Sequence, residues 1–301
     1  MKYTLNQLKI FHIVVKMKSI SRAAEELNLT QPAVSIQIKK LQDQFEIPLI
    51  EIIGRKVFIT DFGKSIAGVS QVLLDDINLI NETVSNYKGV LTGKLSISLV
   101  STAKYVMPYF LEGFMRKYPN VELDIDVTNK GKVVKSLENN ECDFALVSVL
   151  PTTIHLNSIP LLENELHLVG SQKMSDTINS PEQLANQTLI FRENGSATRN
   201  AMEEYLSTNN VTGYKKMVLV SNEAVKQAVQ AGLGYSLMPV IGLRDSIKLK
   251  RIKTLSLPGL PITTMWNLVY DKQKRLSPAA KALIEYLMEE KENIVKTNFN
   301  F

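Results

Sequence analysis

The chain has 301 residues, which is enough for more than one domain because domains usually hold about 100 to 200 residues. Hydrophobic residues make up 45% and charged residues 22% of it, which excludes wholesale disorder and fibrous architectures. No run reaches the roughly 18 apolar residues of a membrane-spanning helix, and the first residues lack the apolar core of a secretory signal. We therefore expect a cytoplasmic protein that does not enter a membrane.

The single cysteine and the placement of charge narrow the classes further. Cys142 excludes a disulfide within the chain and argues against a multi-cysteine metal site, so we expect a buried free thiol. Residues 1–60 hold nine Lys/Arg against five Asp/Glu, a balance of +4 out of +5 for the whole chain. A basic N-terminal part suits DNA or an acidic membrane surface, although so small a surplus also fits an ordinary solvated face.

Three helices are predicted near the N-terminus. Apolar residues at helical spacing predict a first helix over about residues 5–17. A short second helix, over about residues 21–27, can begin at Ser21, whose hydroxyl would accept a backbone N–H. Thr30 can cap a third helix, with Pro32 in its first turn, where the missing N–H costs little.

The third helix has one apolar and one polar face. The apolar residues that would face the core are Val34, Ile38, Leu41 and Phe45. The opposite face carries donors, acceptors and positive charge, on Gln31, Ser35, Gln37, Lys39, Lys40 and Gln42. A glutamine can pair with adenine in the major groove, a serine can bond a base or a phosphate, and lysines can neutralise phosphates. An exposed helix face that happens to lack acids is the alternative.

A hairpin and a long helix complete this part of the chain. Residues 48–53 and 55–60 are predicted to form a hairpin with Arg55 and Lys56 near its tip, as in the wing of a winged helix-turn-helix. Beyond it, over residues 61–90, apolar residues recur every seven positions, which predicts a long helix with a coiled-coil-like seam. Dimerisation through this seam is favoured over an amphipathic helix that lies on its own domain.

The second half alternates strands and helices. Strands are predicted over about residues 95–99, 121–127 and 143–149, and helices over about 107–118, 132–139, 197–207 and 222–231. A capping box, Ser180-Pro181-Glu182-Gln183, marks a restart of the pattern after about residue 164. Such alternation implies parallel βαβ units in two similar α/β subdomains.

Hydroxyl-rich segments follow predicted strands where open α/β folds bind ligands and helix N-termini favour anions. Ser101 and Thr102 end the first strand, and Gly195-Ser196-Ala197-Thr198-Arg199 opens a later helix. We predict a cleft between the subdomains that binds an anionic metabolite, with candidates Ser101, Thr102, Gly195, Ser196, Thr198 and Arg199, and with Asn129 and Asn222 at its rim. The alternative is that these hydroxyls are only helix caps.

Two other classes of protein compete with a DNA-binding regulator. An enzyme is disfavoured because the sequence has no His-Glu-x-x-His, no Gly-x-Ser-x-Gly and no P-loop, and Gly232-Leu233-Gly234 lacks the last glycine of a dinucleotide fingerprint. A solute-binding protein would share the α/β half, but the basic helix-turn-helix and the missing signal peptide argue against it. Redox sensing through Cys142 lacks a second cysteine and an obvious cationic neighbour.

The stretch from Ser19 to Ser35, SISRAAEELNLTQPAVS, and the following Gln37-Ile38-Lys39-Lys40-Leu41 resemble the N-terminal signature of LysR-type transcriptional regulators. The resemblance covers essentially the whole chain. By position it implies that Ser21, Arg22, Thr30, Gln31, Pro32, Ser35, Gln37 and Lys39 lie at or near DNA, with Arg55 in the wing. Two departures weaken the expected grip on phosphates: Leu49-Ile50-Glu51-Ile52 stands where the family usually has Leu-Phe-x-Arg, and Ile36 stands where many members carry a basic residue. Ile36 suits contact with a thymine methyl.

The resemblance also implies the organisation of the chain. We expect an all-α winged helix-turn-helix domain (1–60), a linker and dimerisation helix (61–90) and an α/β periplasmic-binding-protein-like effector domain (91–301). Subdomain I would comprise 91–163 and 267–301, and subdomain II 164–266. The expected partners are double-stranded DNA with a dyad-symmetric site, a small anionic effector and further copies of the chain, as a homodimer or dimer of dimers. RNA polymerase is a candidate partner, and neither a cofactor nor a metal is expected.

Three segments resemble more narrowly the LysR-type branch that regulates carbon-fixation operons: Val100–Tyr105, Arg192–Arg199 and Ser221–Gly234. Members of that branch respond to phosphorylated metabolites, which the resemblance implies as the effector class. Carboxylates and sulfate fit the same hydroxyls, so the ligand stays open, as do the operator and the choice between activation and repression.

Overall fold

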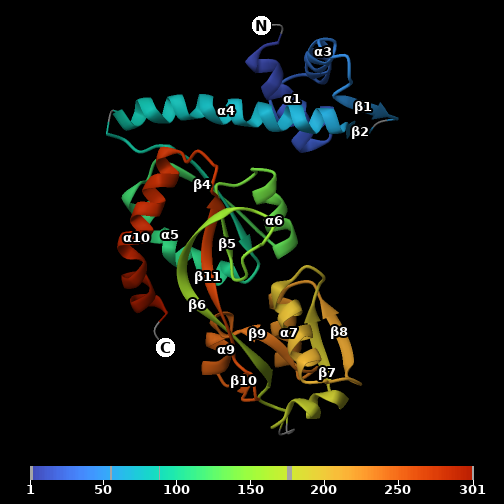
Figure 1. Ribbon diagram of the computed structural model, residues 1–301, viewed down its shortest axis with the longest axis vertical. Helices are drawn as coiled ribbons and strands as arrows, with labels where there is room; N and C mark the ends of the chain where they lie inside the picture. Colours follow the sequence, from blue (N-terminus) through green and yellow to red (C-terminus); the bar gives the residue numbers. More distant parts are fainter. Residues whose placement is uncertain (1–2, 55, 88, 175–177, 300–301) are drawn as a thin grey trace. The chain divides into compact units, whose positions relative to one another are not determined.

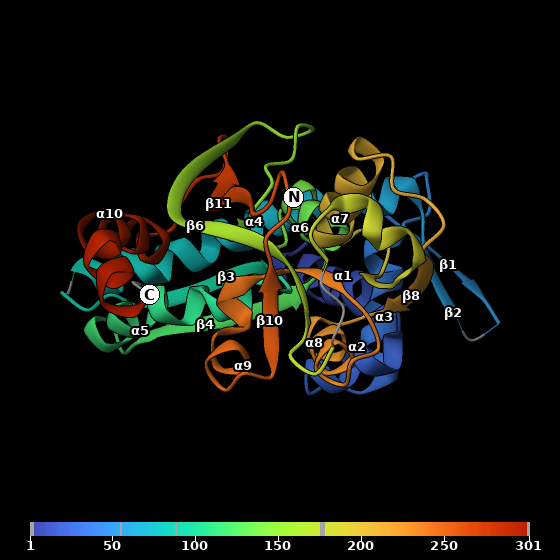
Figure 2. The ribbon, with the colours of Figure 1, turned by 90° about the horizontal axis from the view of Figure 1, so that it is seen from below.

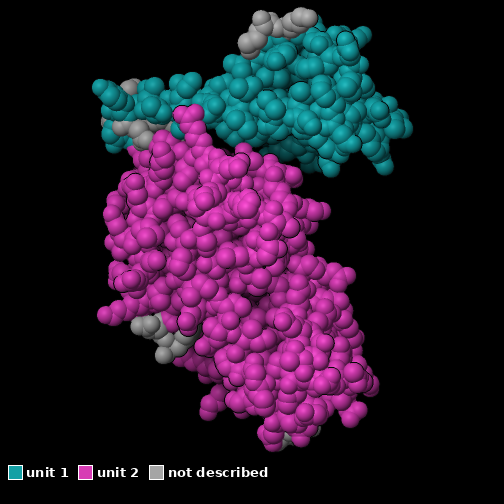
Figure 3. All heavy atoms as spheres, viewed as in Figure 1, with its two compact units in different colours: residues 1–90 teal, residues 91–301 magenta. Residues whose placement is uncertain are grey.

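The structure is a computed structural model that describes residues 3–54, 56–87, 89–174 and 178–299. It divides into two compact units, residues 1–90 and 91–301, which Figure 3 colours separately. Within the described ranges, no helix is both long and apolar enough to cross a membrane.

The first unit has three helices, a hairpin and a long helix (Figure 1). These elements are α1 (Leu5–Met17), α2 (Ile20–Glu26), α3 (Gln31–Gln42), β1 (Ile50–Ile53), β2 (Lys56–Ile59) and α4 (Asp61–Tyr87). Strands β1 and β2 pair antiparallel, as predicted for the wing. One hydrophobic core, centred on Phe11, Val14, Val34 and Leu41, joins the helices.

The start of α2 differs from the prediction. Ser19 caps this helix, with its Oγ accepting from the backbone N of Arg22 at 3.3 Å, and the prediction that Ser21 is the cap is wrong. The reason is the backbone of Lys18, which adopts a left-handed conformation and ends α1 only two residues before α2. Thr30 does cap α3, with its Oγ1 accepting from the N of Ala33 at 3.4 Å.

Gln42 connects α3 to the wing. Its Oε1 accepts from the backbone N atoms of Leu49 and Ile50, each at 3.0 Å. Gln42, predicted on the polar face of the third helix, thus uses its amide oxygen to orient the first wing strand.

Helix α4 carries the predicted seven-residue apolar pattern on an exposed face. Its inner side packs Ala67 and Ser70 into the unit. The exposed apolar side chains, which we call the seam, are Val69, Val72, Leu73, Ile80, Val84 and Tyr87. Within it, Val69 is 62% and Ile80 63% exposed, so a long apolar face lies open.

The second unit is built on a seven-stranded sheet and a smaller two-stranded one. Its helices are α5 (Met107–Lys117), α6 (Lys130–Glu138), α7 (Ala197–Thr208), α8 (Asn222–Gln230), α9 (Arg244–Lys248) and α10 (Pro278–Asn298). The strands of the large sheet are β10 (Ile252–Leu255), β6 (Leu156–Ser171), β11 (Ile262–Asp271), β5 (Phe144–Val147), β3 (Gly93–Val100) and β4 (Val121–Thr128), with β9 (Ser236–Pro239) beside β6. The small sheet pairs β7 (Thr188–Arg192) with β8 (Lys215–Leu219).

The predicted parallel βαβ units are confirmed. Strand β3 pairs parallel with both β4 and β5, and β7 pairs parallel with β8. Figure 1 shows α5 and α10 on one side of the large sheet and α6 on the other. This follows from right-handed crossovers, because α5 and α6 connect strands in opposite directions along the sheet.

The second unit has two lobes with separate hydrophobic cores. Lobe I draws its core from residues 95–161 and 266–299, and lobe II from residues 166–257. Strands β6 and β11 pair antiparallel and run through both lobes, as Figures 1 and 2 show. Their ladder shifts register between Trp266 and Asn267. Continuous strands, rather than loops, therefore connect the lobes.

The Gly232-Leu233-Gly234 segment ends α8 and leads into β9, as predicted. Gly232 has a φ of +84°, which suits glycine at the end of a helix. At Gly234 a Cβ would lie 2.2 Å from the carbonyl oxygen of Thr188, so any side chain would collide with the backbone of β7. The glycines thus serve a helix end and a close backbone approach.

Candidate DNA interface and effector site

Helix α3 presents the predicted polar face. Gln31 and Lys39 are exposed, Ser35 is half-buried, and the three lie at four-residue spacing along one side of the helix. The apolar residues predicted for the other side, Val34, Ile38 and Leu41, are buried. The first turn of α3 carries no acidic residue, so a phosphate backbone would meet no repulsion there.

The remaining predicted DNA contacts are mostly solvent-accessible. Ser21, Arg22, Thr30 and Pro32 are exposed, and Gln37 is half-buried. The hydroxyl of Thr30 is used by its cap. Arg55 lies outside the described residues.

The departures from the usual family pattern place apolar side chains on the surface. Ile36 on α3 and Ile52 in the wing are both more than half exposed, as is Ile53 beside Ile52. Exposed isoleucines add apolar contact area but no charge, so they fit base methyl groups better than phosphates.

Arg192 is the centre of the predicted effector site, although the predicted site residues do not include it. It ends β7, is 4% exposed, and donates from Nη2 to Ser101 Oγ at 3.1 Å. Its Nη1 donates to Asn222 Oδ1, and Asn222 Nδ2 in turn donates to Ser101 Oγ at 3.4 Å. Ser101 belongs to lobe I, and Arg192 and Asn222 to lobe II. The structure thus brings two predicted residues together across the lobes through an arginine.

The carboxylate of Glu193 neutralises this arginine. Arg192 Nε donates to Glu193 Oε2 at 2.8 Å, and Arg192 Nη2 donates to Glu193 Oε1 at 2.9 Å. Two parallel N–H···O bonds from one edge of a guanidinium are the geometry that also recognises phosphate.

The hydroxyls at the start of α7 are buried and face each other. Ser196 and Thr198 are less than a tenth exposed, and their hydroxyl oxygens lie 2.8 Å apart. Ser196 occupies the cap position of α7 without a side-chain cap bond in the described structure, and the same holds for Thr102 at its short helical turn. For these two residues, the alternative that the hydroxyl is only a cap does not hold.

Different contacts are made by the three other predicted effector residues, Asn129, Gly195 and Arg199. Asn129 is a helix cap, with its Oδ1 accepting from the N of Lys132 at 3.0 Å. A Cβ on Gly195 would lie 3.8 Å from that Oδ1, so these two predicted residues meet across the lobes. Arg199 Nε donates to Glu203 at 3.0 Å, and its Nη1 donates to the carbonyl oxygen of Arg192 at 3.3 Å. Arg199 therefore holds the end of β7.

The charge of Arg199 is already balanced. Glu203 accepts from Arg199 and also from Lys216 Nζ, each at 3.0 Å. The bond from Lys216 is the largest cause that lowers the pKa of Glu203, and the charge of Arg199 lowers it further. This carboxylate is shared between two cations, whereas Glu193 pairs with Arg192.

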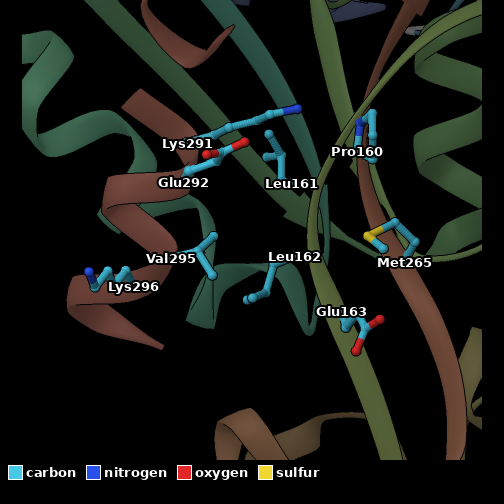
Figure 4. A pocket seen from close by; sticks show the side chains of 9 residues that line it. All are labelled: Pro160, Leu161, Leu162, Glu163, Met265, Lys291, Glu292, Val295 and Lys296. Atoms are coloured by element: carbon cyan, nitrogen blue, oxygen red, sulfur yellow. The ribbon is translucent and has the colours of Figure 1, made fainter. Parts of the chain in front are cut away.

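A pocket of about 470 Å³ lies elsewhere in the second unit (Figure 4). Strands β6 and β11 and helix α10 line it with Pro160, Leu161, Leu162, Glu163, Met265, Lys291, Glu292, Val295 and Lys296. Figure 4 shows Lys291, Glu292 and Lys296 on the α10 side and Glu163 on β6, so its rim carries both signs of charge. None of the predicted effector residues lines this pocket.

Cys142 is buried and unpaired by any disulfide, as predicted. Burial is the largest effect on the thiol and raises its pKa to about 11, against a smaller opposite effect of Lys274. A group of three His, Cys, Asp or Glu side chains that could hold a metal does not occur among the described residues.

The raised pKa predicts that the Cys142 thiol reacts slowly with alkylating reagents. At pH 8, about one thiol in a thousand would be ionised, against about a quarter in an unfolded chain. We expect iodoacetamide to modify the native protein at least about 100-fold more slowly than the urea-unfolded protein. Mass spectrometry of timed samples measures both rates, and equal rates would contradict the burial of this thiol.

An exposed helix-turn-helix, followed by a two-lobed α/β domain with a buried arginine and hydroxyls between its lobes, defines a DNA-binding regulator that responds to a ligand. Residues 5–64 match the bacterial regulatory helix-turn-helix protein model of the lysR family, and residues 88–292 match the LysR substrate binding domain. The protein belongs to the LysR family of transcriptional regulators.

Similar proteins agree with this assignment. The chain is 35% identical over 293 residues to the RuBisCO operon transcriptional regulator of Allochromatium vinosum, covering 96% of this chain and 97% of that protein. It is 33% identical over 294 residues to the HTH-type transcriptional activator CmpR of Synechocystis sp., covering 97% of each. The structure of the Synechocystis PCC6803 CcmR regulatory domain in complex with 2-PG is 30% identical, with a TM-score of 0.63, covering 67% of this chain and 99% of that one.

The resemblance to the branch that regulates carbon-fixation operons is confirmed by these relatives. They are transcriptional regulators and not enzymes, so family membership sets the enzyme class aside.

Proposed function

We propose that this protein regulates transcription of a carbon-fixation type of operon and senses a small phosphorylated anion between lobes I and II. The observation that carries the proposal is Arg192, a buried cation bonded to Ser101 of lobe I and to Asn222 of lobe II. Glu193 neutralises this guanidinium in the absence of ligand, and a ligand anion that takes its place would bind where the lobes meet.

The surroundings of Arg192 suit a phosphate. Thr102, Ser196 and Thr198 supply buried hydroxyls that can donate to phosphate oxygens, and α7 and α8 begin directly after Ser196 and Ser221 with helix N-termini, which favour anions. CcmR, the regulator solved with 2-PG, supports a phosphorylated effector for this chain. Sulfate and small carboxylates are the competing ligand classes.

The seam on α4 supports a dimer as the DNA-binding form of the protein. Two copies that pair through their seams would present two α3 helices to successive major-groove segments, about 34 to 36 Å apart on a dyad-symmetric duplex. A dimer of dimers would span two such pairs of sites. We infer that the protein acts in the cytoplasm, with RNA polymerase as the partner that a bound regulator would contact.

Effector binding would act through the arrangement of the DNA-binding units. A ligand shifts an equilibrium between two arrangements only by the difference between its affinities for them, which is about 1 to 3 kcal/mol in typical coupled systems. Closure of lobe I on lobe II around the anion is the change that the ligand would favour.

Replacing Thr102 with valine tests the ligand site. The side chain is 8% exposed, so valine keeps its shape and removes the hydroxyl. Calorimetry with 2-PG should show an affinity loss of about 10- to 100-fold, because a hydrogen bond to a charged group contributes about 1.5 to 3 kcal/mol. DNA binding without ligand should be unchanged.

The exposed Thr208 on α7 provides a matched control, since Thr208→Val removes the same hydroxyl away from the site. Full affinity for 2-PG in the Thr102→Val variant would remove Thr102 from the site. Failure of the wild type to bind 2-PG, phosphate, sulfate or a carboxylate would contradict the anionic effector.

A further inference from the structure

The ion pair between Arg192 and Glu193 does not join distant parts of the fold. The two residues are adjacent in sequence at the end of β7, so their contact adds little to the packing of one element on another. The bonds that do join elements leave from other atoms, Nη1 to Asn222 and Nη2 to Ser101. Glu193 can therefore leave Arg192 without separating the lobes.

Glu193 occupies the edge of Arg192 that an anion would need. Its two carboxylate oxygens accept from Nε and Nη2 at 2.8 and 2.9 Å, the side-by-side arrangement that phosphate also adopts on a guanidinium. The Glu193 side chain is 21% exposed, whereas that of Arg192 is 5% exposed. The carboxylate thus has a route to solvent that the guanidinium lacks.

We propose that Glu193 is a built-in competitor of the effector, an inference that rests on the proposed function of the same site. Without ligand, its carboxylate neutralises the buried Arg192. When the effector binds, its anionic group takes the Nε and Nη2 edge, and Glu193 turns toward water while Ser101 and Asn222 keep their bonds to Arg192.

This exchange sets a threshold for binding that doubly charged ligands pass more readily than singly charged ones. A monocarboxylate would replace one single negative charge with another of the same geometry, and so would gain little. A phosphate monoester carries a charge of about −1.5 to −2 at neutral pH and three acceptor oxygens. Glu193 therefore raises the threshold for binding, and phosphorylated metabolites pass it more readily than monocarboxylates.

Arg199 differs from Arg192 in what its carboxylate partner connects. The carboxylate that pairs with Arg199 is Glu203, which also binds Lys216 from β8 and so connects two elements. Removing Glu203 would disturb the fold of lobe II, whereas removing the charge of Glu193 would leave a buried cation open to a ligand.

Calorimetry on the full-length Glu193→Gln variant tests the proposal. Glutamine keeps the size of the side chain and removes its charge. We expect the affinity for 2-PG to rise about 10-fold, because the ligand no longer competes with a charge-assisted bidentate pair. Acetate, which we expect to bind the wild type weakly, should gain about as much, because both ligands displace the same carboxylate, so that the preference for 2-PG over acetate stays level.

A control and a second variant keep the outcome interpretable. Glu204→Gln, on the exposed side of α7, removes the same charge from the same lobe and should leave both affinities unchanged. Glu193→Asp keeps the charge but shortens its reach, and should bind 2-PG with an affinity between those of the wild type and the glutamine variant. This aspartate variant decides the question if the glutamine variant does not fold.

Failure of the Glu193 inference and failure of the proposed function would give different results. If the wild type binds 2-PG and the Glu193→Gln variant binds it equally or more weakly, Glu193 is not a competitor, and this inference falls while the proposed function stands. If the wild type and all Glu193 variants bind neither 2-PG, inorganic phosphate nor acetate, the anionic effector itself is wrong.

Discussion

A protein that carries both Leu73→Asp and Ile80→Asp should be monomeric at micromolar concentration and should bind a dyad-symmetric duplex at least about 100-fold more weakly than the wild type. Both side chains belong to the exposed seam of α4. Burying a leucine or isoleucine stabilises by about 1.5 to 3 kcal/mol, and each residue would be buried twice in a symmetric pair. Four carboxylates at that interface would repel one another instead.

Sedimentation equilibrium measures the mass in solution, and titration of a fluorescent duplex measures the DNA affinity. Asn78→Asp is a suitable control, because Asn78 is an exposed polar residue on α4 outside the seam. Affinity for a single half-site should be unchanged in the double variant. A double variant that remains dimeric would place the dimer interface elsewhere.

The second large effect is expected at the polar face of α3. Replacing Gln31 or Ser35 with alanine should cost about 1 to 3 kcal/mol on the cognate duplex, which is about 5- to 150-fold in affinity. The loss should be small on random DNA, since a base contact exists only where the matching base is present. Competition titrations with both duplexes measure the difference.

Lys39→Ala is the contrasting variant on the same face. Lys39 is exposed, and a phosphate contact made by its ammonium would be independent of sequence. This variant should weaken binding to all duplexes alike. It should also reduce the slope of log affinity against log salt concentration by about one. If Gln31→Ala or Ser35→Ala behaved in the same way as Lys39→Ala, base readout by that residue would be rejected.

The sequence predicted the helices and strands well because the pattern that identifies each of these elements lies within the element itself. The apolar period and the Thr30 cap placed α3, and the alternation of apolar residues placed β3 and β4. The sequence did not predict the cap of α2 correctly. Ser19 and Ser21 carry the same side chain, and the left-handed backbone of Lys18 makes Ser19 the cap. The bonds from Gln42 to the wing were not predicted, because its partners lie seven and eight residues away, across a turn.

The sequence pointed to the hydroxyls and to Arg199 of the candidate effector site but not to Arg192. Arg192 contacts Ser101, 91 residues away, only because β6 and β11 hold the two lobes against each other. The burial of Arg192 at the end of a strand therefore depends on the fold of the whole second unit and not on its neighbours in the sequence. Arg199, in contrast, carried a readable signal: Glu203 lies four residues further along the same helix, where a pair of opposite charges usually forms.

Selection of bound sequences from a random duplex pool, at two salt concentrations and with or without 2-PG, tests the central claim most directly. The full-length protein should enrich a dyad-symmetric site whose affinity falls steeply with salt, and 2-PG should change the occupancy or spacing of its half-sites. Enrichment of no sequence, in the absence and in the presence of 2-PG, would contradict the account of an anion-controlled, sequence-specific DNA-binding dimer.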